Sequence, residues 1–224
     1  MTSSNIEIVE ETADILSEYG RIPISFEVHS IFRVELVEDG LKGIQLSEHP
    51  VAHSWIKDYD AIKGEGPIRW ADRWDISNWG VISAIASGTR VGGCVIAHAT
   101  QGVHKLEGRN DIAALWDIRV AHRWRGNGIG GLLIESAIAW AKRRNCRMLK
   151  VETQNINVPA CRFYAKHGFK LAAINRFAYP ELPDEVELIW CKELTEKANT
   201  TPQATRASHA PEPYARGEAC LTHD

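Results

Sequence analysis

One segment, ALWDIRVAHRWRGNGIGGLLIESAIAWAK (residues 114–142), constrains the fold more than any other part of the chain. A strand-like run ends in a basic turn with alternating glycines, which let several backbone N–H groups approach one point at the positive end of a following helix. The turn therefore predicts a phosphate or pyrophosphate site, with Arg123 and Arg125 adding charge-assisted contacts. A tight turn with solvated arginines is the structural alternative. Helical spacing from 128 to 144 is carried by Ile129, Leu132, Leu133, Ala137, Trp140 and Ala141.

Other phosphate-binding motifs fit these glycines less well. A Walker loop is excluded because two leucines stand where that motif needs a lysine and a hydroxyl residue. Gly126, Gly128 and Gly131 do match the dinucleotide motif G-x-G-x-x-G, with Glu152 near the end of the next strand. The context is wrong for that motif, because AHRWR separates the strand from the first glycine. Too few residues follow Glu152 to complete a doubly wound sheet.

Composition narrows the classes of protein that remain. Of the 224 residues, 44% are apolar and 25% are charged, which is typical of a folded globular chain. The net charge of -3 gives no general attraction to nucleic acid. No apolar run is long enough to span a membrane and the acidic start is unlike a secretory signal, so a cytoplasmic protein is expected. The 5 cysteines lack a C-x-x-C pair and the 9 histidines are scattered, so no metal site is expected.

The chain is expected to form a single domain over residues 23–194. Residues 1–22 are interpreted as an acidic leader, with a helix over 7–19 where apolar positions alternate with acidic ones. Residues 195–224 contain hardly any aliphatic side chains and are predicted to be a disordered tail.

Further elements are predicted inside the domain, although residues 41–78 show no clear periodicity. Pro159 is expected near the first turn of a helix ending at Lys166, where its missing N–H costs nothing, and Gly168 is expected as the stop. The predicted strands occupy 24–36, a hairpin turning at 87–89, 113–120, 147–152, and a final hairpin formed by 169–179 and 185–190.

Two further motifs point to one family. The turn meets [RQ]-x-x-G-x-[GA] through Arg125, Gly128 and Gly130, and N-x-x-A-x-x-F-Y-x-x-x-G-F runs from Asn157 to Phe169. With an upstream I-R-V, these motifs make residues 81–194 resemble the GNAT superfamily of acetyl-coenzyme A (acetyl-CoA) dependent N-acetyltransferases. The phrases VETQNINVPACRFYAKHGF and VELIWCKEL resemble, more narrowly, the streptothricin acetyltransferases, which inactivate an antibiotic carrying a β-lysine amine.

The resemblance implies an α/β (α+β) GNAT fold, with a mixed, mostly antiparallel sheet flanked by helices. Two of its strands, through Ile118 and Val151, would splay apart to open the acetyl-CoA cleft, and a bulge in the first would free backbone groups for the pantetheine. The pyrophosphate would lie on the glycine turn. The cofactor-binding residues implied are Ile118, Val120, Arg125, Gly126, Asn127, Gly128, Ile129, Gly130 and Asn157.

Acyl transfer to an amine needs a neutral nitrogen and a proton donor for the leaving thiolate. Tyr164 matches the family's phenolic general acid, and packing against Phe163 is the alternative. A phenol with an ordinary pKa of ~10 stays protonated at neutral pH. His122 is one candidate base, but its place in the basic turn more often directs a side chain to solvent.

Two carboxylates, Asp117 and Glu152, are the main candidates for the base. Strand alternation places Asp117 opposite in facing to Trp116, so that both carboxylates could face the cleft. The alternatives are structural ion pairs of Asp117 with Arg119 and of Glu152 with Lys150.

The predicted function is acetylation of a primary amine on a small cationic molecule, such as a streptothricin-type antibiotic, which would confer antibiotic resistance. A protein or peptide N-acetyltransferase and a non-catalytic acyl-CoA binding module are the alternatives. The final hairpin leaves a homodimer open. Aromatic and acidic residues in the first half suit a cation, although packing explains the tryptophans equally well. They are Trp55, Tyr59, Trp70, Trp74, Asp72 and Asp75.

Overall fold

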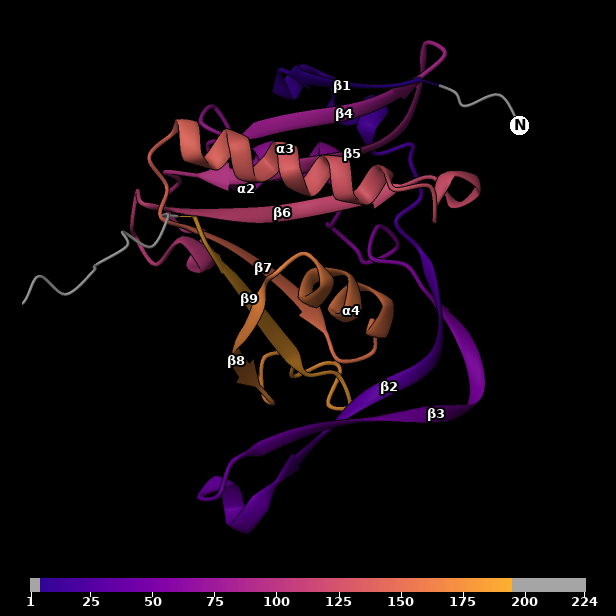
Figure 1. The fold of residues 1–224 in the computed structure, drawn as a ribbon, viewed down its shortest axis with the longest axis vertical. Helices are drawn as coiled ribbons and strands as arrows, with labels where there is room; N and C mark the ends of the chain where they lie inside the picture. Colours follow the sequence, from indigo (N-terminus) through magenta and orange to yellow (C-terminus); the bar gives the residue numbers. More distant parts are fainter. Residues whose placement is uncertain (1–4, 195–224) are drawn as a thin grey trace, which may run out of the picture.

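The computed structural model describes residues 5–194, which build a seven-stranded sheet in the order β1-β4-β5-β6-β7-β9-β8 (Figure 1). Every neighbouring pair is antiparallel except β6 and β7, which are parallel. The expected mixed, mostly antiparallel sheet is confirmed. The strands are β1 (Ile6–Glu11), β2 (Phe26–Leu36), β3 (Ile44–Lys57), β4 (Gly80–Ala86), β5 (Thr89–His98), β6 (Ile112–Val120), β7 (Met148–Gln154), β8 (Lys170–Asn175) and β9 (Glu187–Glu193); the helices are α1 (Leu16–Tyr19), α2 (Trp70–Arg73), α3 (Ile129–Arg143) and α4 (Val158–Lys166).

Helices cover the sheet on both faces. Helix α3 lies across β4, β5 and β6, and α4 lies on the same side beside β8 (Figure 1). The buried face of α3 has the expected spacing except that Leu132 is exposed and Ile134 is buried in its place, and Trp140 near the end of the helix is fully buried. The short helices α1 and α2 contribute to a second cluster on the opposite face, where Trp70, Trp79 and Trp116 pack together. The cores on the two faces hold the central strands in place.

The leader helix expected over residues 7–19 is wrong in its first half. Residues Ile6–Glu11 form β1, which pairs antiparallel with β4 at the edge of the sheet, and only Leu16–Tyr19 are α-helical. Ile6 and Ile8 alternate with acidic residues and pack against the main core. The free edge of β4 offers backbone partners to this segment, and that pairing overrides its weak helical pattern.

Strands β2 and β3 form a long ribbon outside the main sheet, extending below it in Figure 1. The ribbon is fastened at Phe32, whose N–H donates to the Asn155 carbonyl at 2.9 Å and whose carbonyl accepts from the Asn155 amide at 2.9 Å. Strand β3 fills part of the region that lacked periodicity. Most of its residues are exposed or half-buried, so no alternation between a buried and a solvent face is imposed on them.

The predicted hairpins are confirmed: β4 turns into β5 at Ser87 and Gly88, and β8 pairs with β9. The α4 helix begins after Asn157 with a proline in its first turn, as expected. The tail predicted over 195–224 lies outside the described residues. Between residues 5 and 194, no helix has the length and apolar character required to cross a membrane.

We expect Gly80→Ala to lower the free energy of unfolding by about 1–3 kcal/mol, the usual cost of overpacking a core. A Cβ at this position would overlap the buried indole of Trp140, which lies directly on the glycine. Urea unfolding measures the change. The control Glu135→Ala alters the exposed face of α3, the helix that carries Trp140. A Gly80→Ala variant no less stable than this control would contradict the packing.

Candidate active site

The parallel strands β6 and β7 are paired only at their starts. The register runs from Ile112 opposite Met148 to Leu115 opposite Val151. Beyond that point β7 continues to pair with β9, and β6 continues to pair with β5. The edge of β6 after Leu115 therefore faces a gap instead of a strand, so its backbone groups there need partners other than a strand.

Strand β6 also contains a bulge at Trp116. Val95 on β5 is opposite Asp117, and the next residue, Ile96, is opposite Leu115, so Trp116 is the extra residue. The bulge reverses the alternation, placing both Trp116 and Asp117 on the side of α1. The expectation that Asp117 faces away from Trp116 is therefore wrong, because simple alternation cannot include a bulge.

The gap opens into a cleft of about 1090 Å³, large enough for an extended cofactor arm and a second molecule. The backbone of β6 forms one wall and β7 forms the other. Segments 57–66 and 178–185 close the remaining sides. Most of the residues predicted for catalysis or cofactor binding line this cleft: Asp117, Ile118, Val120, Arg125, Gly126, Gly128, Ile129, Gly130, Glu152, Asn157 and Tyr164.

The glycine turn forms the start of α3. Gly126 and Gly128 both have φ +81, and no atom lies within 4 Å of where a Cβ would stand, so the turn is open on that side. Gly128 is the N-cap and provides no side chain to cap the first amides of the helix. These N–H groups and the helix dipole suit an anion, as the sequence predicted. Asn127 does not line the cleft; its amide donates to the Trp124 and Arg125 carbonyls and braces the turn.

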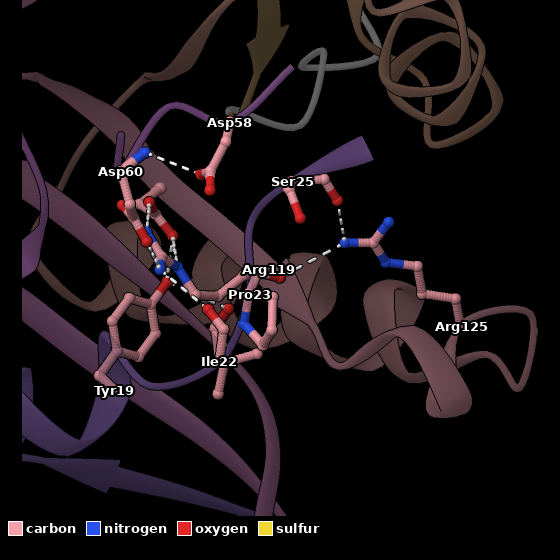
Figure 2. A network of polar contacts seen from close by, with 10 residues as sticks. Tyr19, Ile22, Pro23, Ser25, Asp58, Asp60, Arg119 and Arg125 are labelled. Carbon is pink, nitrogen blue, oxygen red and sulfur yellow. Dashed lines mark hydrogen bonds and ion pairs between the residues drawn. The ribbon is translucent and has the colours of Figure 1, made fainter. Parts of the chain in front are cut away.

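The Arg125 guanidinium has a structural task in addition to its predicted one. Its Nε donates to the Val120 carbonyl at 2.9 Å. One of its Nη atoms donates to the Ser25 carbonyl at 3.0 Å (Figure 2). Burial lowers the pKa of Arg125 from its ordinary value. The side chain thereby ties the turn to the end of β6 and to the segment before β2. His122 likewise contacts the Ser25 carbonyl, at 2.9 Å, and lies outside the cleft.

Tyr164 and Asn157 reach the cleft from α4. Tyr164 is only 5% exposed, and burial raises the pKa of its phenol well above the ordinary value. The phenol is therefore protonated at every physiological pH and can only donate a proton when an acceptor approaches. The Asn157 side-chain oxygen caps α4 by accepting from the Ala160 N–H at 3.2 Å, which leaves its amide group available to the cleft.

Glu152 lies on β7 just beyond the last residue paired with β6. It forms an ion pair with Lys105 and accepts the Tyr179 hydroxyl at 2.6 Å. Burial, and then the charge of Glu152, raise the pKa of the neighbouring Glu187. Glu152 thus stands at the cleft with a second carboxyl beside it that takes up a proton more readily than usual. Lys105 and Tyr179 come from distant loops, and no local motif marked them.

Of the two structural ion pairs considered as alternatives for these carboxylates, one is absent from the structure and the other is present. The Glu152–Lys150 pair is wrong, because Lys150 pairs with Glu107. The Asp117–Arg119 pair is confirmed, with Nε and Nη donating to the carboxylate at 2.9 and 2.6 Å. Asp117 also accepts from the Tyr19 hydroxyl. Both oxygens of Glu152 are engaged as well, by Lys105 and Tyr179, but its side chain is 20% exposed against 6% for Asp117, so Glu152 is the more accessible of the two carboxylates.

Only part of the aromatic and acidic set named from the sequence lines the cleft. Tyr59, Trp70 and Trp74 line the cleft, whereas Trp55, Asp72 and Asp75 do not. Lining charges are mostly paired: Lys57 with Glu185, Arg73 with Glu65, Lys105 with Glu152, and Arg119 with both Asp60 and Asp117.

The remaining charges give the two sides of the cleft opposite signs. Among residues 5–194, Arg125 and Lys166 have no carboxylate within ion-pair distance, and both belong to the side formed by α3 and α4. On the loop side, Glu181 has no cation within ion-pair distance among residues 5–194. Arg119 is shared by Asp60 and a second carboxylate, so negative charge exceeds positive charge on this side. The cleft therefore favours an anionic ligand beside the helices and a cationic one beside the facing loops.

Similarity to known proteins agrees with this architecture. The model of the Acetyltransferase (GNAT) family matches residues 47–169, more than half of the chain. The chain belongs to this family of acetyltransferases.

The most similar relatives include streptothricin acetyltransferases. The protein from Escherichia coli is 43% identical over 84 residues, which are 36% of this chain and 48% of the relative. Streptothricin acetyltransferase A of Bacillus subtilis (strain 168) is 41% identical over 83 residues, again 36% of this chain and 48% of the relative. The chain thus spans about half the length of these relatives, and the narrower resemblance is confirmed over that part.

Solved structures extend the likeness to most of the fold. Nourseothricin acetyltransferase superposes with a TM-score of 0.67 at 23% identity, covering 85% of this chain and 99% of the other. A candidate streptothricin acetyltransferase from Bacillus anthracis str. Ames, solved in complex with acetyl coenzyme A, has a TM-score of 0.65 and is 26% identical, covering 84% and 99%. The GNAT fold implied by the sequence is confirmed.

We expect Asp117→Ala to lower the free energy of unfolding by about 2–4 kcal/mol, because it removes one of two carboxylates that neutralise a buried guanidinium. Chemical denaturation at neutral pH measures the loss. Asp111→Ala is the matched control, since it breaks the exposed pair with Arg109 and should leave the midpoint nearly unchanged. Equal effects of the two substitutions would contradict the structural role of Asp117.

Proposed function

We propose that this protein is an acetyl-CoA dependent N-acetyltransferase that acetylates a primary amine on a small cationic molecule. The observation that carries the proposal is the separation of β6 from β7 beside the uncapped start of α3. It offers unpaired strand backbone for a pantetheine arm and free amides for a diphosphate. The acetyl-CoA complex of the Bacillus anthracis relative supports the same choice of cofactor.

The residues around the cleft fit acetyl-CoA, which supplies the activated acetyl group when bound. The amides from Gly126 to Gly130 would hold the diphosphate, since both positive-φ glycines leave that side of the turn open. Backbone groups at Ile118 and Val120 would hold the pantetheine along the unpaired edge of β6. Asn157 would contact the cofactor from α4. Holding the thioester and the amine together would account for much of the rate gain.

Two side chains would move the protons. Glu152 would accept the proton that the acceptor ammonium must lose before its nitrogen attacks the thioester carbon. As the carbon–nitrogen bond forms and the carbon–sulfur bond breaks, the departing thiolate would take the Tyr164 phenolic proton. One of the two protons left on the attacking nitrogen leaves to water, so the amide keeps one N–H, while Glu152 returns its proton to solvent and solvent reprotonates the phenolate. Each turnover then gives one amide and one thiol.

A streptothricin-type antibiotic is the proposed acceptor. The loop side of the cleft combines aromatic rings with excess carboxylate, which suits a cationic amine. The relatives named streptothricin acetyltransferase support the same substrate and an antibiotic-resistance role. We propose the cytoplasm as the location, since Cys94, Cys146, Cys161 and Cys191 are free thiols. The homodimer through the final hairpin stays a prediction, with β8 at one edge of the sheet.

Release of free thiol from acetyl-CoA should depend on streptothricin and on enzyme concentration. Mass spectrometry should show an acetyl group on one primary amine of the antibiotic. Monoamines and N-terminal peptides serve as comparison acceptors. Turnover of peptides alone would favour a protein N-acetyltransferase, and acetyl-CoA binding without turnover of any acceptor would favour a binding module.

Tyr164→Phe should reduce kcat by about 10²-fold, the usual scale of a general acid, while the affinity for acetyl-CoA is retained. Because the buried phenol has a raised pKa, the ratio of wild-type to variant kcat should stay constant from about pH 6 to pH 9. Steady-state kinetics and calorimetric titration measure the two effects. A ratio that falls as pH rises across this range would mean that Tyr164 titrates there and has another role.

A further inference from the structure

A buried arginine joins three separate parts of the chain next to the cleft (Figure 2). The Arg119 side chain on β6 is 1% exposed. It donates to Asp60 in the segment after β3 at 2.7 and 3.2 Å, to the Ile22 carbonyl at 3.0 Å, and to Asp117 on its own strand. The Tyr19 ring lies against the guanidinium, at 5.0 Å from its centroid. Arg119 therefore connects the sheet to the segment that covers the cleft.

The guanidinium has no donor left for a ligand. Its 5 recorded hydrogen bonds match the five N–H groups that an arginine carries. Both oxygens of Asp60 are likewise engaged by Arg119. The guanidinium cannot bind substrate without losing a buried charge-assisted bond, so Arg119 must act through what it holds in place. Asp60, whose side chain is 28% exposed, keeps free lone pairs, so attraction of a cation by Asp60 is the effect that the test must separate from anchoring.

Asp60 holds an irregular segment that forms part of the cleft wall. Tyr59, Asp60, Ile62, Glu65 and Gly66 all line the cleft, and none belongs to a helix or strand. The hydrogen bonds within the segment are local turns, such as that from the Ile62 N–H to the Tyr59 carbonyl at 3.2 Å. Side chains supply its anchors to the rest of the molecule, and the one through Asp60 reaches Arg119, whose side chain is 1% exposed.

Within residues 58–66, the other side-chain anchors contain no buried charge pair. Glu65 pairs with Arg73 at 2.8 Å, where both side chains are substantially exposed, and the Tyr59 hydroxyl donates to Gln154 across the cleft. Exposed ion pairs contribute little to holding a loop. The Asp60–Arg119 pair, with its guanidinium removed from solvent, is the anchor whose loss should change the position of the wall most.

We propose that Asp60 and Arg119 are positioning residues that fix segment 58–66 as the acceptor-side wall of the cleft. The effect on the acceptor rests on the proposed function, whereas the anchoring itself does not. Because the diphosphate site lies on α3 and the anchored segment lies on the facing side, losing the anchor should weaken acceptor binding selectively. Acetyl-CoA binding should be unchanged.

Asp60→Asn tests the proposal without removing the neutralising partner of Arg119. Asp117 still binds the guanidinium through two hydrogen bonds, so the protein should fold. We expect KM for the acceptor to rise about tenfold or more, while KM for acetyl-CoA and kcat change less than about threefold. Asp60→Glu, which restores the carboxylate, should recover part of the loss. Asp72→Asn is the control, since it removes an equal charge from the exposed pair with Arg69 outside the cleft.

Ionic strength separates anchoring from simple attraction of the amine. A tenfold KM difference caused by lost attraction should largely disappear at about 1 M salt, where the Debye length is about 3 Å. A difference caused by a displaced wall should persist. Disappearance of the effect at high salt, or an equal rise in the KM of acetyl-CoA, would overturn the proposal.

Hydrogen exchange provides a readout that does not need activity. In Asp60→Asn, amides of residues 58–66 should exchange about tenfold faster or more, while those of α3 keep the wild-type rate. Unchanged exchange in this segment would overturn the anchoring role even if kinetics changed. If the wild-type protein acetylated no amine, the proposed function would fail, and the exchange result would still decide whether Asp60 anchors the wall.

Discussion

The departure of β6 from β7 after Leu115 is the constraint on which the site depends. Two parallel strands that diverge inside a sheet leave N–H and C=O groups without their usual partners, and such groups require others. The Trp116 bulge rotates the rest of β6, so Ile118 and Val120 face the core below α3 while Asp117 and Arg119 face α1. The same gap receives Tyr164 from α4, the residue proposed as the proton donor.

Beyond the bulge, β6 places two charged side chains on the α1 side, where they form polar contacts with each other and with neighbouring segments. Asp117 and Arg119 follow the bulge and are almost completely buried, which is tolerable only because each charge is paired and hydrogen-bonded. Asp117, which the sequence named as a candidate base, is thereby also the structural partner of Arg119. Glu152, which lies beyond the paired part of β7 and contacts Lys105 and Tyr179, is the more accessible carboxylate and is the one proposed as the base.

Local patterns predicted the elements that a short stretch of chain determines. The glycine turn, helix α3, the start of α4 with its proline and both hairpins depend on neighbouring residues, and the structure has them where the sequence placed them. The bulge at Trp116, strand β1 and the pairs of Lys105 and Asp60 depend on residues far apart in the chain. Periodicity cannot report such contacts, because strand register and ion-pair partners are set by packing in three dimensions.

A crystal structure of the protein with coenzyme A tests the central claim most directly. The account predicts that the diphosphate lies against the amides of Gly126 to Gly130 and that the pantetheine runs between β6 and β7 along Ile118 and Val120, with its sulfur beside Tyr164. Coenzyme A bound at another surface, or bound with β6 and β7 closed against each other, would contradict it.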